Sequence, residues 1–205
     1  MANVTNVKSK FFGAVDGLDA DGISVAATIG SATTLTLGGT LTSGGSYTSG
    51  DNISQPITIL SAADDSGITF TIVGTDAVGD AQTEVLTGAN TTTATSSGYF
   101  NTVTSITTSA ATAGNVSAGV TATGTGTVFA GRTRIRGLQG LSGTSAGNLL
   151  FKNTSVTGTT LLTVPTQAAA ELIEPYIPDN AVLFDAGAYV NFGSAVATVT
   201  VFYDG

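Results

Sequence analysis

Residues 68–86 read ITFTIVGTDAVGDAQTEVL and carry the clearest structural signal in the sequence. Ile68, Phe70 and Ile72 alternate with two threonines and a valine, which is the two-residue period of a half-buried strand. The next residues, 74–80, supply Gly and Asp at turn positions, and the run 81–86 alternates again. This stretch therefore predicts a β-hairpin with Ile68, Phe70 and Ile72 on the core face.

The sequence around this hairpin predicts more short strands, rich in Val, Ile and Thr and separated by Gly, Ser, Asn and Asp. Between residues 17 and 123 the expected strands are 23–28, 33–37, 55–60, 68–73, 82–87, 99–107 and 115–121. Short strands with turn signals between them indicate a β-sandwich of immunoglobulin-like size, without the Cys and Trp markers of antibody domains. The expected core is Ile57, Ile59, Ile68, Phe70, Ile72, Val85, Phe100, Ile106 and Val116.

A run of small residues, TATGTGTVFAG at 121–131, predicts a boundary, with a linker at 124–131. Residues 1–131 carry two basic and nine acidic side chains, net −7, whereas residues 132–205 carry four and five, net −1. The second β-sandwich domain, immunoglobulin-like or jelly-roll-like, is expected over 132–205, with strands at 132–138, 148–152, 159–164, 181–184, 188–192 and 196–203. One helix-like stretch, 166–172, interrupts them. A domain of roughly 75 residues is marginal alone, so we expect it to lean on a partner chain or on the first domain.

Residues 1–16 form the expected N-terminal arm, and Phe11 and Phe12 are its only bulky apolar pair. One interpretation is a frayed terminus. The other is an arm that docks both rings on a neighbouring molecule, because an exposed pair of this kind is an aggregation liability without a pocket.

Composition argues against several classes of function. The chain has six Lys and Arg against 14 Asp and Glu, net −8, which disfavours nucleic acids and anionic membranes as partners. No apolar run is long enough to span a membrane as a helix, and no secretory signal is visible. His and Cys are absent, which removes the usual catalytic triads and zinc ligand sets. Carboxylate pairs such as Asp64/Asp65 or Glu171/Glu174 are the only basis for a hydrolase, so no enzyme activity and no cofactor are expected.

Four acidic residues, Asp64, Asp65, Asp76 and Asp80, cluster at two turns. Calcium takes oxygen ligands from such loops, although the spacing matches no EF-hand. The alternative is that they are ordinary turn residues whose side chains bind nearby backbone amides.

Arg132, Arg134 and Arg136 are the only arginines and occupy alternate positions, which lie on one face of a strand. They have two interpretations. A charged edge strand resists sheet-to-sheet pairing. An interface would set the three guanidinium groups against acidic groups of a neighbouring subunit. We therefore take Arg132, Arg134, Arg136, Phe11 and Phe12 as candidate interface residues.

Residues 64–119, taken together with four stretches between residues 132 and 205, resemble modules of virion structural proteins from tailed bacteriophages, many of them marine. Residues 64–119 read DDSGITFTIVGTDAVGDAQTEVLTGANTTTATSSGYFNTVTSITTSAATAGNVSAG. The four stretches are RTRIRGLQGLSGTSAGNLLFKN (132–153), TGTTLLTV (157–164), IPDNAVLFDAGAYVNF (177–192) and VATVTVFYDG (196–205). IPDNAVLFDAGAYVNF is the more specific motif.

The resemblance implies a capsid decoration (cement) protein or a head or tail accessory protein, without catalytic residues. The expected partners are the major capsid protein and further copies of the chain, as in a trimer. The expected location is the capsid surface of the virion, after synthesis in the host bacterial cytoplasm. A receptor-binding or fibre-like adhesin on the same virion is the alternative.

Overall fold

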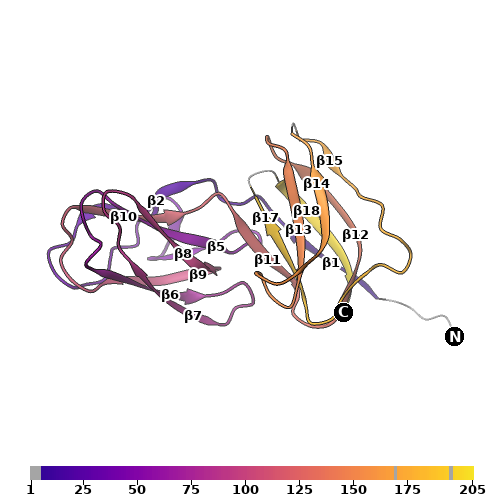
Figure 1. Ribbon diagram of the computed structural model, residues 1–205, viewed down its shortest axis with the longest axis horizontal. Helices are drawn as coiled ribbons and strands as arrows, with labels where there is room; N and C mark the ends of the chain where they lie inside the picture. The colour runs from indigo at the N-terminus through magenta and orange to yellow at the C-terminus, as the bar shows by residue number, and fades with distance from the viewer. Residues whose placement is uncertain (1–5, 169, 194–195) are drawn as a thin grey trace. The chain divides into compact units, whose positions relative to one another are not determined.

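The computed structural model describes residues 6–168, 170–193 and 196–205, and every regular element in those ranges is a β-strand. All strand pairs are antiparallel and belong to four sheets (Figure 1). The predicted all-β class is therefore confirmed. Of the residues expected to form a helix at 166–172, Thr166 ends one strand, Leu172 begins another, and Ala169 lies outside the described residues.

The chain folds into two compact units whose boundaries differ from the predicted domains. Unit 1 contains Met1–Val15, Gly50–Ile53 and Thr123–Gly205, and unit 2 contains Asp16–Ser49 and Ser54–Ala122. The segment expected to be a linker is strand β11 (Gly124–Phe129) of unit 1. The segment expected to be a free arm contains strand β1 (Val7–Phe12), which also belongs to unit 1.

Unit 2 encloses its core with two sheets. One has the order β2-β10-β5-β8 and the other β3-β4-β9-β6-β7. Their strands are β2 (Asp19–Thr28), β3 (Thr42–Ser43), β4 (Ser46–Thr48), β5 (Gln55–Ser61), β6 (Thr69–Thr75), β7 (Ala81–Thr87), β8 (Thr93–Phe100), β9 (Thr102–Thr108) and β10 (Asn115–Val120). The single strand expected at 99–107 is two strands that meet at Asn101, and residues 33–37 contribute only an isolated bridge at Thr34.

The predicted hairpin is β6 and β7, and its register runs from Thr69 opposite Thr87 to Thr75 opposite Ala81. Phe70 and Ile72 are fully buried, as expected, and Ile68 is packed against the same core. Val85 is the exception, since it lies opposite Thr71 on the outer face with 61% of its surface exposed. The inner positions of β7 are instead the half-buried Gln82, Glu84 and Leu86.

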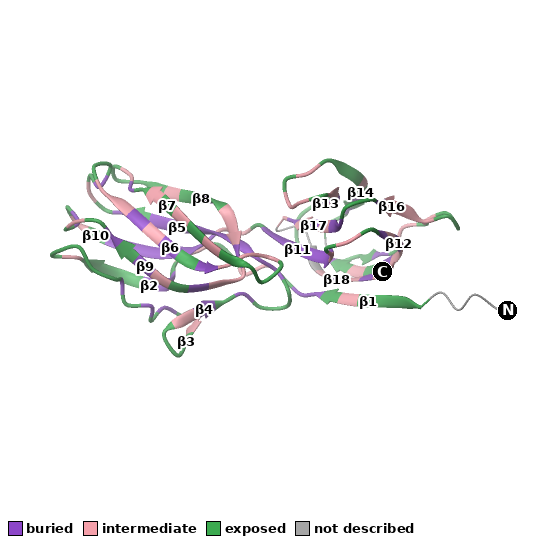
Figure 2. Cartoon of the chain, turned by 90° about the horizontal axis from the view of Figure 1, so that it is seen from below, coloured by how far each residue is buried: buried purple, intermediate pink, exposed green. Residues whose placement is uncertain are grey.

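Unit 1 also packs two sheets around one core, and β11 is the strand that Figure 2 draws as almost entirely buried. Its sheets have the orders β1-β18-β12-β15, with β16 also paired to β12, and β11-β17-β13-β14. The strands not yet given are β12 (Thr133–Ser142), β13 (Gly147–Asn153), β14 (Thr160–Thr166), β15 (Leu172–Ile173), β16 (Val182–Phe184), β17 (Ala188–Phe192) and β18 (Val196–Asp204).

The packing of Phe12 explains why most of the Gly-rich stretch 124–131 forms strand β11 rather than a linker. The Phe12 ring is fully buried and lies 5.5 Å from the ring of Phe192, centroid to centroid. A Cβ atom on Gly126 would overlap the Phe12 ring. Glycine at this strand position therefore makes room for an aromatic side chain, which is one of the recognised roles of glycine within sheets.

Unit 1 also includes the four-residue segment Gly50–Ile53, which lies in the sequence between the two parts of unit 2. Asp51 and Asn52 have φ of 55° and 65°, a left-handed conformation that Asp and Asn tolerate better than most residues. The Asn52 side-chain amide donates to the carbonyl oxygen of Phe11 at 3.1 Å, and Ile53 is buried in the core. This turn thus fastens β1 to unit 1.

Candidate interface at the arginine cluster

Arg134 and Arg136 lie at the start of β12, which is an interior strand, and Arg132 directly precedes it. β18 pairs with one side of β12, and β15 and β16 pair with the other. The interpretation of a charged edge strand is therefore wrong. Thr133 and Ile135 are buried, which directs the alternate positions 132 and 134 outward. The register shifts between Ile135 and Gly137, so Arg136 occupies an irregular position in the ladder.

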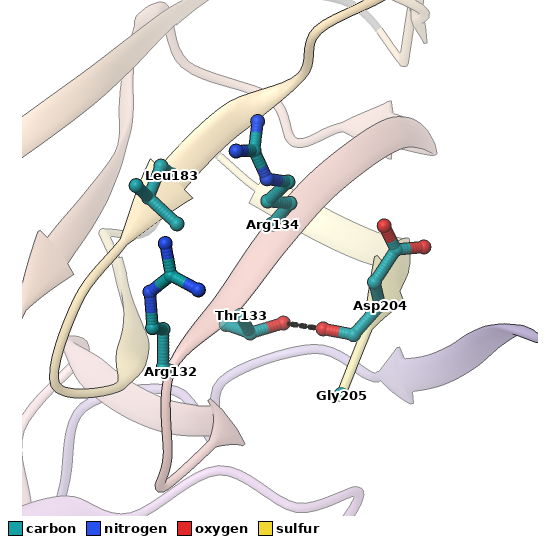
Figure 3. A pocket seen from close by; sticks show the side chains of 6 residues that line it. All are labelled: Arg132, Thr133, Arg134, Leu183, Asp204 and Gly205. Atoms are coloured by element: carbon teal, nitrogen blue, oxygen red, sulfur yellow. Dashed lines mark hydrogen bonds between the residues drawn. The ribbon is translucent and has the colours of Figure 1, made fainter. Parts of the chain in front are cut away.

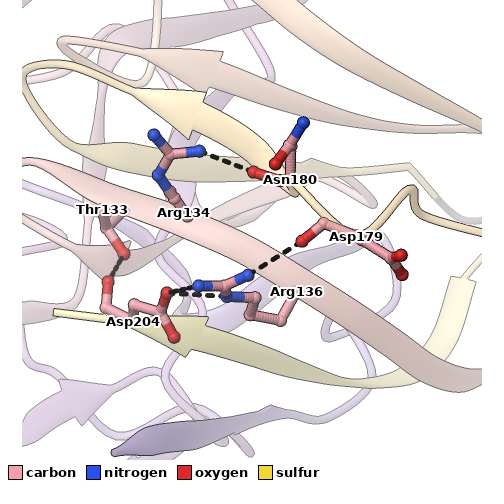
Figure 4. Close-up of polar contacts among 6 residues, drawn as sticks. All are labelled: Thr133, Arg134, Arg136, Asp179, Asn180 and Asp204. Carbon is pink, nitrogen blue, oxygen red and sulfur yellow. Dashed lines mark hydrogen bonds and ion pairs between the residues drawn. The ribbon is translucent and has the colours of Figure 1, made fainter. Parts of the chain in front are cut away.

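Arg136 is held by partners within unit 1. Its Nε and Nη2 atoms contact one carboxylate oxygen of Asp204, Oδ2, at 2.6 and 2.5 Å (Figure 4). Its Nη1 atom donates to the carbonyl oxygen of Asp179 at 3.1 Å. The hydrogen bond to Asp204 raises the pKa of Arg136, so the guanidinium stays charged. Arg136 therefore ties the segment before β16 to the end of β18.

Arg134 makes a second tie to the same segment. Its Nη1 atom donates to the carbonyl oxygen of Asn180 at 2.6 Å. The segment also contains Pro175 and Pro178, which limit its backbone freedom. Together these contacts fix a loop, residues 174–181, that the sequence had not marked as functional.

This loop presents one aromatic side chain to solvent. Tyr176 is 87% exposed, whereas the neighbouring Ile177 packs against the core of unit 1. Tyrosine is over-represented among the side chains that dominate protein interfaces, because its ring offers a large contact area with few rotatable bonds. The available sequence signal was an aromatic residue between two prolines.

Arg132 is the most accessible of the three arginines. Its Nε atom lies 3.8 Å from a carboxylate oxygen of Asp185, and the two side chains are 67% and 72% exposed. Such an exposed pair contributes little to stability and leaves the guanidinium available.

A shallow pocket separates Arg132 from Arg134. It has a volume of about 200 Å³ and is lined by Arg132, Thr133, Arg134, Leu183, Asp204 and Gly205 (Figure 3). The Thr133 hydroxyl donates a hydrogen bond to the carbonyl oxygen of Asp204, so two of the lining residues are joined. Two guanidinium groups beside a single apolar side chain, Leu183, suit a carboxylate carried on a partner's side chain.

The two phenylalanines of the expected arm have different environments. Phe12 lies in the core of unit 1 and is not accessible, so the expectation that it docks on a neighbour is corrected. Phe11 is 48% exposed on β1 and stays a candidate contact residue. The difference follows from the strand, since adjacent residues point to opposite faces of a sheet.

Two of the four acidic residues, Asp64 and Asp76, accept hydrogen bonds within their own turns, whereas Asp65 accepts from the amide of Ala113. Asp64 Oδ1 accepts from the amide and hydroxyl of Ser66, and these bonds lower the pKa of Asp64. Asp76 Oδ1 accepts from the amides of Val78 and Asp80. These contacts are those of turn residues. Within the described ranges no three acidic side chains are grouped as metal ligands would be.

Comparisons with known proteins identify no relative: no family model, no curated protein and no solved structure matches the chain. In the part of the chain that the structure describes, no helix is long and apolar enough to cross a membrane.

Proposed function

We propose that this chain is a non-enzymatic structural protein of a tailed-bacteriophage virion, and specifically a capsid decoration protein. The position of IPDNAVLFDAGAYVNF at 177–192, the more specific of the motifs that carry the resemblance, supports this proposal. Asp179 and Asn180 of this motif accept hydrogen bonds from Arg136 and Arg134, and Leu183 lines the arginine pocket. The motif of the resemblance and the candidate interface thus coincide.

The proposed mechanism is mechanical. Arg132, Arg134 and Tyr176 would contact acidic and apolar groups of the major capsid protein. A ligand that binds only one state of a protein stabilises that state by mass action, so a decoration protein that binds only the expanded shell stabilises it. Antiparallel sheets around two buried cores supply a scaffold suited to this role, since binding would not require the chain to refold.

Imaging of the protein on its particle tests the proposal. We expect copies distributed over the whole shell, in the hundreds for a typical capsid. A few copies at the tail or at vertices would overturn the decoration role and favour the receptor-binding alternative.

Charge reversal tests the interface. Arg134→Glu should strongly reduce the occupancy of the particle while the fold is retained, because Arg134 is tied to the loop by a single bond to Asn180. Lys152→Glu is the matched control, since it changes the net charge equally on β13, away from the pocket lining. Equal occupancy for wild type and Arg134→Glu would contradict the assignment of this surface.

A further inference from the structure

We propose that two copies of this chain associate through the outer edge of β2, residues 24–28, in unit 2. The two β2 strands would pair antiparallel about a twofold axis and join their sheets into one. This inference does not depend on the proposed function.

The outer edge of β2 is covered only at its beginning. Gly39 and Leu41 donate their amides to the carbonyl oxygens of Ile23 and Gly22. Beyond that point β10 is the only strand among the described residues that pairs with β2. Residues 25–28 are all exposed, and Val25 keeps 53% of its surface accessible. An exposed apolar edge of this kind is a template for pairing with another strand.

A groove runs along this edge. It has a volume of about 290 Å³ and lies between β2 and residues 33–36, with Val116 among its lining residues. Residues 33–35 lie beside β9 of the other sheet. The amide of Leu35 donates to the carbonyl oxygen of Ile106, and the amide of Thr108 donates to that of Thr33. Both sheets of unit 2 thus end here, and no other strand in the described part of the chain covers the gap between them.

The opposite side of unit 2 is closed. Glu84 on β7 accepts hydrogen bonds from the amides of Ser97 and Gly98 on β8, at 2.7 and 2.9 Å. These strands are the last of their respective sheets, so one carboxylate joins the two edges.

In unit 1, two of the end strands, β1 and β14, carry residues that discourage pairing. β1 has Lys8 and Lys10, and β14 has Pro165. Lysine and proline are devices that blunt sheet edges. Residues 24–28 of β2 have neither.

Charge indicates that the occupant is a second copy. The chain carries a net charge of −8, yet no charged residue occurs between Asp21 and Asp51. In a twofold interface each copy presents the same patch, so a charged patch would repel itself. Residues 24–28 of β2 and residues 29–36 form an uncharged surface, so two copies of an acidic chain can meet there without that repulsion.

Light scattering on the purified full chain at tens of micromolar tests the pairing. We expect a mass of about 40 kDa, twice the 20.2 kDa of one chain. Ala26 is at the centre of the edge, so a pair centred there places residue 26 of one copy opposite residue 26 of the other. Ala26→Lys and Ala26→Glu should each give about 20 kDa, and an equal mixture of the two variants should restore about 40 kDa.

Ala81→Lys is the matched control, because Ala81 is an exposed alanine on the edge strand β7, and it should leave the mass unchanged. A monomeric wild type, or Ala26 variants that remain dimeric, would overturn the proposal. Hydrogen exchange on the wild type makes the test independent of variant folding. Amides of residues 24–28 should exchange more slowly at high than at low protein concentration, and identical exchange would equally overturn the pairing.

Discussion

The side-chain amide of Gln55 donates to the carbonyl oxygen of Thr121 at 2.7 Å and also to that of Asp16 at 3.0 Å. Asp16 is the first residue of unit 2, and Thr121 is next to its last. Gln55 itself is fully buried. One amide group therefore holds the entry and exit of the unit together.

Gln55→Leu should destabilise unit 2 markedly. The change removes both hydrogen bonds that the Gln55 amide donates, and removal of one partner of a buried hydrogen bond costs about 1–3 kcal/mol. Urea unfolding followed by circular dichroism measures the loss. Gln82→Leu is the control, because Gln82 makes a single bond of 3.5 Å to the carbonyl oxygen of Tyr99. Equal losses for both variants would argue against the role assigned to Gln55.

Alkaline pH should destabilise unit 2 through Tyr47. Burial raises the pKa of Tyr47 above its ordinary value of 10.0, and the nearby Asp16 raises it further. The folded state therefore holds the phenol proton more tightly than the unfolded state, and this stabilisation is complete below pH 10 and declines as the pH rises above it. The urea midpoint should fall between pH 8 and pH 11 in the wild type and fall less in Tyr47→Phe. Parallel curves would contradict this cause.

Removal of the Glu84 carboxylate should loosen the closed side of unit 2. Glu84→Ala loses the bonds to Ser97 and Gly98, and a partly exposed set of this kind is worth about 1–2 kcal/mol. Glu84→Gln should cost less, since its amide keeps one acceptor oxygen. Amide exchange at Ser97 and Gly98 should accelerate in Glu84→Ala. Unchanged exchange there would show that the bonds do not hold the edge.

Phe70→Ala should cost about 3–5 kcal/mol, because a fully buried ring is replaced by a cavity. Native domains hold only about 5–15 kcal/mol in total, so unit 2 should melt much earlier or fail to accumulate in soluble form. Thr71→Ser, on the opposite face, should cost little. A one-residue slip in register exchanges the faces, so comparable losses for the two variants would refute the assigned face.

Gly126→Ala should destabilise unit 1 by about 1–3 kcal/mol, because the added methyl group overlaps the Phe12 ring. Phe12→Leu, which frees space, should reduce that cost when the two changes are combined. A double-mutant cycle measures the coupling by urea unfolding. Strictly additive effects would show that the two residues do not share this space.

The strands that the sequence predicted best have both an alternating pattern and an apolar inner face. β6 and β18 are examples, with Phe70 and Ile72 in one and Val199 and Val201 in the other fully buried. β7 differs from the prediction because its inner face carries Gln82 and Glu84. Their hydrogen-bond partners lie on β8, in a different sheet, so the pattern of β7 alone assigned Val85 to the core.

The other differences between prediction and structure also depend on residues that are far apart in the sequence. TGTGTVF has the composition of a linker, and its place in a sheet depends on Phe12, more than a hundred residues earlier. The arginine positions could be selected from spacing alone, but their partners could not. Asp179 and Asn180 offer backbone carbonyl oxygens, which every residue has, so no side-chain pattern identified them. The sequence did not predict the exposure of Tyr176, because this exposure depends on the contacts of Arg134 and Arg136 with the loop 174–181.

The pairing of β1 with β18 has a consequence for the order of events during synthesis. Phe12 lies opposite Val199, which follows it by 187 positions (199 − 12), and this length takes roughly 10–40 s to translate at about 5–20 residues per second. Every strand of unit 2 has been made by Val120, whereas β1 waits until the ribosome has released the last strand. A chain truncated before β18 would therefore leave β1 without its partner strand and Phe12 exposed. We expect cellular quality control to recognise such fragments by the incomplete fold of unit 1.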